Sequence, residues 1–321
     1  MALVLYGFGT FGILVGFSVA SLFASIIGYT YLIPRAIPQS SKQEEIKEGL
    51  KQIVKFSGLN YFSVGMRTLS TQIGVMILGT QNFEWAAFYG LSVLISSIVG
   101  GVLLAVSRAI LPTASEEWAK GNKKEFEGVF NAAIRISLLI SGFGFLVLMI
   151  EPSYVLKLIS ESYLEASSAL RILVVASILN SLGALMISML NAANRASDVA
   201  RIGVVSSIIT IALTFILSPT IGLEGASIAM LVGSALGLIL SAIMLKIREQ
   251  LIPSKKSLIK PSISTLTAFL IGYSLLILSN NVMIALALAI LSYAGFSMIY
   301  RVTTKTELKT LLTIVLRTIK S

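Results

Sequence analysis

Apolar runs of about twenty residues alternate with short polar segments along almost the whole chain. Nine such runs are present, at residues 9–33, 57–80, 85–110, 129–150, 167–190, 202–218, 223–245, 262–279 and 282–300. A helix of about 20 apolar residues crosses the hydrocarbon core of a bilayer. The short segments of alternating polarity that are typical of outer-membrane barrels are not seen. The pattern predicts an all-α polytopic membrane protein with about nine transmembrane helices.

The basic residues fall in alternate loops between these runs, while the intervening loops carry mostly glutamate, including Glu84, Glu151 and Glu224. Loops rich in Lys and Arg stay in the cytoplasm. We therefore expect the C-terminus inside and the N-terminus outside. A first span that sends its N-terminus outward without a basic flank is an unusual start. This suggests that the chain is the C-terminal part of a longer protein.

Two segments outside the spans are amphipathic. Residues 42–56 place Ile46, Leu50, Ile53 and Val54 on one helical face with charges opposite, and the basic tail after residue 301 has a similar stripe. Such helices lie in the membrane interface. We expect a linker helix at residues 39–56 and a cytoplasmic tail at residues 302–321.

Composition narrows the possible functions. The chain of 321 residues is 55% hydrophobic and 12% charged, with a net charge of +10 and no Cys or His. The absence of Cys and His excludes disulfides, thiol nucleophiles and Cys/His zinc sites. The positive charge is explained by cytoplasmic loops, so no nucleic-acid partner is expected, and membrane lipids are the expected surroundings.

The run at residues 57–80 has an arginine near its middle. At a rise of 1.5 Å per residue, Arg67 lies more than about 15 Å from the flanking charges of Lys55 and Glu84. Polar and small residues recur around it at spacings of three and four: Asn60, Ser63, Arg67, Ser70, Thr71 and Gly74. This spacing puts them on one helical face, which predicts a polar stripe facing a wet cavity.

Ionisable residues inside a membrane are usually functional, and no span of this chain offers Arg67 an acidic partner. Phosphate and pyrophosphate match the geometry of a guanidinium group, so the stripe predicts an anion site. The alternative is a structural arginine, satisfied by helix carbonyls or by Asn180 of the span at residues 167–190.

Other intramembrane charges are less specific. Arg135 and Arg171 lie within two turns of the ends of their spans, where snorkelling to the interface explains them as well as a binding site does. We expect Arg135 to assist substrate binding near the cytoplasmic mouth.

Signatures of catalysis are absent from the sequence. There is no nucleophile triad, no GxxxxGK[ST] nucleotide loop and no carboxylate pair within a span. We expect no catalytic residue, no metal, no cofactor and no enzymatic reaction.

Three motifs resemble the second half of polysaccharide-biosynthesis flippases, within the superfamily of multidrug, oligosaccharidyl-lipid and polysaccharide exporters. They are PTASEEWAKG at Pro112 to Gly121, YLEASSALRIL at Tyr163 to Leu173, and PTIGLEGA at Pro219 to Ala226. The resemblance covers about residues 55 to 247. It implies a MATE-like fold of two six-helix lobes around a central cavity, working by alternating access on lipid-linked sugars.

On that template the chain divides into five parts: the last helix of a first lobe at 1–38, the linker at 39–56, a six-helix C-terminal lobe at 57–247, an added helix pair at 248–301 and the tail at 302–321. A first lobe, on the same chain or a second one, would be the partner. Arg67 would line the cavity.

The leading hypothesis is a multi-pass flippase of the cytoplasmic membrane that moves a lipid phosphate- or pyrophosphate-linked oligosaccharide outward. Arg67 would bind the phosphate, assisted by Arg135, with polar contacts from Asn60, Ser63, Ser70, Thr71 and Asn180. Two alternatives remain. A cation-coupled drug or metabolite antiporter of the same superfamily would need an intramembrane carboxylate. A non-transporting fragment or assembly partner would need no cargo.

Overall fold

The computed structural model describes residues 19, 21–27, 30, 43–279, 281–300 and 302, with side chains within the first long helix described from Tyr61 onward. The chain forms two compact units, residues 1–55 and residues 56–321. In the first unit, residues 21–27 are helical and exposed. Three predictions therefore lie outside what the structure describes. Most of the predicted first span and of the basic tail lies outside the described residues, and the apolar face of the predicted linker helix lies outside the described side chains.

The described chain is helical almost throughout. Its elements are α3 (Gln43–Gln81), α4 (Phe83–Ala119), α5 (Lys123–Ile150), α6 (Pro152–Lys157), the short 3₁₀ helix η3 (Glu161–Ala166), α7 (Ser167–Ala192), α8 (Ala196–Ile221), α9 (Leu223–Glu249), α10 (Lys255–Ser279) and α11 (Val282–Ile299). Seven of these helical segments are long and apolar enough to cross a membrane. The predicted all-α polytopic fold is confirmed.

The helix α3 is not among those seven. Its backbone is continuous from Gln43, so the expected linker and the second predicted span form one helix. Its second half carries Arg67, Gln72 and several hydroxyl side chains. These polar groups lower its hydropathy, in keeping with a helix that faces more than lipid.

Short turns with specific caps join the later helices. Asn82 opens α4 by accepting a hydrogen bond from the backbone N–H of Glu84, and Asn281 opens α11 in the same way toward Met283 and Ile284. Gly222 joins α8 to α9 at φ 64°, a left-handed conformation that glycine adopts without strain. Two of these connections join helices that pack along each other, α8 with α9 and α10 with α11.

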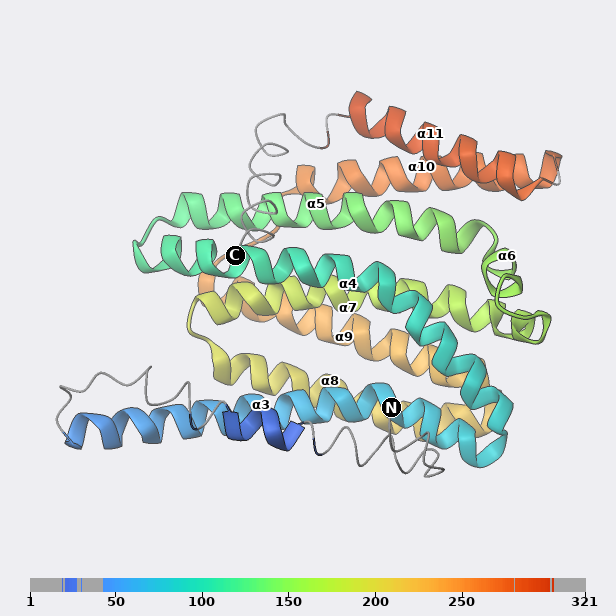
Figure 1. Cartoon of the computed structure of the whole chain (residues 1–321). Helices are drawn as coiled ribbons and strands as arrows, with labels where there is room; N and C mark the ends of the chain where they lie inside the picture. The colour runs from blue at the N-terminus through green and yellow to red at the C-terminus, as the bar shows by residue number, and fades with distance from the viewer. Residues whose placement is uncertain are drawn as a thin grey trace. The chain divides into compact units, whose positions relative to one another are not determined.

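The helix α7 lies at the centre of the second unit, packed against α4 on one side and α9 on the other, with α8 beyond α9 (Figure 1). Serines link α7 to α4: Ser177 Oγ donates to the carbonyl of Ser96 at 2.8 Å, and Ser181 Oγ to that of Gly100 at 3.2 Å. The pair α10 and α11 packs on α5.

Two apolar clusters fix the two ends of the central helices. One surrounds Tyr89 and Leu170, and the other surrounds Phe130 and Met189. A smaller cluster around Leu146 and Tyr293 joins α5 to α10 and α11. The hydroxyl and charged groups treated below are therefore held by a well-packed frame.

Candidate functional site

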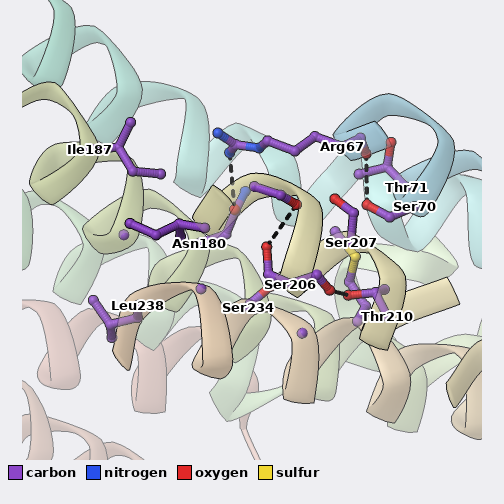
Figure 2. Close-up of a pocket in the computed structure, with 16 residues that line it drawn as sticks. Arg67, Ser70, Thr71, Asn180, Ile187, Ser206, Ser207, Thr210, Ser234 and Leu238 are labelled. Carbon is purple, nitrogen blue, oxygen red and sulfur yellow. Dashed lines mark hydrogen bonds between the residues drawn. The ribbon is translucent and has the colours of Figure 1, made fainter. Parts of the chain in front are cut away.

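A polar pocket lies between α3, α7, α8 and α9, entirely within the second unit (Figure 2). The pocket has a volume of about 80 Å³, which is room for several water molecules. Its polar lining comprises Arg67, Ser70 and Thr71 of α3, Asn180 of α7, Ser206, Ser207 and Thr210 of α8, and Ser234 of α9. No carboxylate lines this pocket in the described part of the chain.

The charged member of the pocket is half-buried Arg67. Its Nη2 donates a hydrogen bond to Asn180 Oδ1 at 3.4 Å (Figure 2). The amide is neutral, so this contact satisfies one N–H group but leaves the positive charge uncompensated. A low-dielectric setting of this kind favours an anionic ligand.

The hydroxyl groups around Arg67 bond to carbonyls of their own helices. Ser70 Oγ donates to the carbonyl of Arg67 at 2.8 Å, and Thr210 Oγ1 donates to that of Ser206 at 2.9 Å. A hydroxyl hydrogen rotates to suit its partner, so each group can redirect its donor to a ligand. The pocket can thus present hydroxyl donors and one guanidinium group to the same anion.

Glycines let the surrounding helices approach closely. A Cβ atom at Gly203 of α8 would overlap Ser63 Oγ and lie 3.8 Å from Arg67 Cδ, so α3 packs directly on α8 there. A Cβ atom at Gly233 of α9 would overlap Thr210 Oγ1. These bare backbone positions bring the polar side chains of three helices together.

The structure brings some of the predicted site residues together in this pocket and leaves others outside it. Arg67, Ser70, Thr71 and Asn180 line one pocket. Ser63 is buried against Gly203 and does not line this pocket. Asn60 belongs to the part of α3 in which only the backbone is described.

Arg135 is not brought to this pocket. It is half-buried on α5, and its Nη1 donates to Ser257 Oγ of α10 at 3.5 Å. Nearby, Asn131 Oδ1 accepts from the backbone N–H of Ser254 at 2.8 Å. Arg135 therefore belongs to the junction of α5 with α10.

The sequence reasoning missed the hydroxyl groups on α8 and α9, which form the wall opposite Arg67. A usable signal was present. Ser206, Ser207, Thr210 and Thr214 recur at helical spacing within an apolar run, as the residues of the α3 stripe do.

Comparisons with known proteins agree on one fold. The MatE family model matches residues 52–216. The solved structure described as the lipid II flippase MurJ in its inward closed conformation is similar over 92% of this chain and 63% of its own, at 16% identity and a TM-score of 0.70.

Two MATE structures are also similar. One, in the bent conformation, covers 84% of this chain and 68% of its own, at 17% identity and a TM-score of 0.53. The other, an outward-facing multidrug resistance MATE family transporter of the MOP superfamily, has the same coverage at 18% identity and a TM-score of 0.51. A search of curated proteins found no match. The chain thus spans less than two thirds of the length of the MurJ structure.

Proposed function

Because this chain belongs to the MatE family of the MOP superfamily, we propose that it works as part of a membrane transporter. The cargo would be an oligosaccharide linked to a lipid through phosphate or pyrophosphate. The cargo would move from the cytoplasmic leaflet of the cell membrane to the outer leaflet. No covalent bond of the cargo changes, so the protein would not be an enzyme.

The observation that carries the proposal is the environment of Arg67. Its guanidinium group faces hydroxyl and amide side chains, and no carboxylate lines the pocket within the described chain. A phosphate oxygen would accept from Arg67 and from Ser70, Thr71 or Asn180. Charge-assisted hydrogen bonds of this kind are about twice as strong as neutral ones.

The other predicted residues have secondary roles in this proposal. Ser63 and Asn60 lie on the same helix as Arg67, about one and about two turns toward its N-terminus, respectively. Arg135, at the junction of α5 and α10, would meet the headgroup before it enters the Arg67 pocket. We keep the division into lobe and added helix pair at residues 57–247 and 248–301 as part of the proposal.

A cation-coupled antiporter of the same superfamily is the second candidate, supported by the likeness to MATE structures. Coupling would need a carboxylate inside the membrane. The buried acidic side chain of the described chain, Asp198, lies at the start of α8 and is already paired with Arg248. This arrangement favours the lipid-phosphate cargo.

The third candidate is an assembly partner without cargo of its own. Binding of a lipid-linked phosphate distinguishes this candidate from the first proposal. An assembly partner needs a second lobe and no phosphate site.

The test is binding of a polyprenyl pyrophosphate to the purified full chain in detergent, measured by native mass spectrometry. We expect Arg67→Ala to weaken binding at least tenfold, since a hydrogen bond to a charged group is worth about 1.5–3 kcal/mol. Arg67→Lys should retain part of the affinity, because the charge remains but the planar fork is lost.

The matched control is Arg171→Ala, which removes an exposed arginine near the N-terminal end of α7. It should bind as the unmodified chain does. If both alanine variants bind equally well, the pocket does not read phosphate and the proposed cargo is wrong.

A further inference from the structure

A second cavity lies where α4 ends, α5 begins and α9 ends. It has a volume of about 330 Å³ and is lined by Trp118, Lys123, Phe126, Arg248, Glu249 and Gln250. Two residues with positive φ shape its rim: Gly121 at 70° and Gln250 at 53°. This cavity shares no residue with the Arg67 pocket.

Most charges around this cavity are already compensated. Arg248 Nε lies 3.0 Å from Asp198 Oδ2. Glu249 lies 2.9 Å from Arg195 Nε and also accepts from Trp118 Nε1 at 3.1 Å. The carboxylates are therefore turned to their own partners.

Lys123 differs from these residues. Its Nζ donates to Gln250 Oε1 at 3.0 Å, and among the described residues no carboxylate lies within ion-pair distance of it. Its cation thus has a neutral partner at the edge of a cavity, and an anion would compete well for it.

The cavity is also amphipathic. Trp118 beside it is 40% exposed, whereas Phe126 is only 3% exposed. Indole rings at the ends of membrane helices sit at the level of lipid headgroups. Basic pockets between such helices on the cytoplasmic side bind anionic headgroups. Lys246 in the last turn of α9 adds positive charge at this end.

We propose that this cavity binds the phosphate headgroup of an anionic membrane phospholipid. A phosphate oxygen accepts from Lys123 Nζ in place of Gln250, and the first carbons of the lipid lie along Trp118. The site is independent of the proposed cargo. It would hold the ends of α4, α5 and α9 together in a membrane of suitable composition.

The test uses Trp118 as its own reporter. The chain contains two tryptophans, so Trp85→Phe leaves Trp118 alone. This variant is reconstituted in nanodiscs of phosphatidylcholine and phosphatidylglycerol, with bromine on the acyl chains of one lipid at a time. We expect brominated phosphatidylglycerol to quench Trp118 several-fold more strongly than brominated phosphatidylcholine at equal mole fraction.

Lys123→Gln should abolish this preference. The matched control, Lys124→Gln, removes the same charge from the next residue, which does not line the cavity, and should leave the preference unchanged. Equal quenching by the two lipids, or equal loss in both variants, would overturn the proposal in favour of general surface attraction. Displacement by millimolar glycerol phosphate would overturn it in favour of a site for soluble phosphate.

Discussion

Arg67 of α3 and Asn180 of α7 meet in the membrane region of the second unit, where the guanidinium Nη2 donates to the amide Oδ1 at 3.4 Å. The contact joins residues 113 positions apart in the sequence. It engages one of the five N–H donors of the guanidinium group. A structural role and a binding role are therefore compatible, because the same arginine can hold α7 and still face the pocket.

Asn180→Asp should weaken binding of polyprenyl pyrophosphate by about tenfold or more while leaving the chain folded. The new carboxylate would pair with Arg67 and cancel the charge that attracts the anion, and a charge-assisted bond is worth about 1.5–3 kcal/mol. Native mass spectrometry measures the affinity.

The control for this variant is Asn191→Asp, which makes the same change at an exposed position near the end of α7. Its affinity should match that of the unmodified chain. Unchanged binding by Asn180→Asp would show that the Arg67 charge does not control the ligand.

Gly233→Ala should lower the thermal unfolding temperature, and Gly237→Ala should not. A Cβ atom at Gly233 would overlap Thr210 Oγ1 and lie 2.9 Å from Thr210 Cβ, whereas one at Gly237 would meet Ser206 Cβ at an ordinary 3.6 Å. Overpacking of this kind typically costs about 1–3 kcal/mol. Adding Thr210→Ala to Gly233→Ala should recover part of the loss. Equal unfolding temperatures for the two glycine variants would contradict the close packing of α8 on α9.

The sequence was sufficient to predict the all-α polytopic fold and the polar stripe of α3 that lies along the candidate pocket, for a physical reason. Apolar runs and turn residues act locally, so the ends of α5 at Ile150 and of α10 at Ser279 match the predicted span ends. The α3 stripe was visible because Arg67 is costly in lipid. Serines are not costly, since they bond to their own helix, and so Ser206 and Ser207 did not stand out.

The spacing of polar and apolar residues along the chain did not predict the contacts between helices. Arg135 is a second arginine that the sequence predicts to assist in binding, yet α10 packs on α5 and gives it Ser257 as a partner. Which helix lies beside which is decided by non-local features such as the glycine at position 203, against which Ser63 packs. Spacing along one helix carries no information on that choice.

Arg248→Gln should destabilise the chain more than the double change Asp198→Asn with Arg248→Gln. The side chain of Asp198 is only 4% exposed and lies 3.0 Å from Arg248 Nε, so removing Arg248 leaves a buried carboxylate without its main partner. Arg201 is 3.7 Å away and its side chain is 72% exposed, so it compensates only in part. A double-mutant cycle on unfolding in detergent should give a coupling energy of about 1–3 kcal/mol. Additive effects would mean that the pair contributes nothing.

Tyr293→Phe should loosen the pair α10 and α11 from α5. The hydroxyl of Tyr293 donates to the carbonyl of Leu139, and Gly142 leaves room for it, since a Cβ atom there would overlap the hydroxyl groups of Tyr293 and Thr265. Loss of one such bond costs about 0.5–1.5 kcal/mol, which a modest fall in unfolding temperature would report. Tyr273→Phe is the matched control, because Tyr273 is 45% exposed on α10. If the two variants unfold at the same temperature, the pair is held by apolar packing alone.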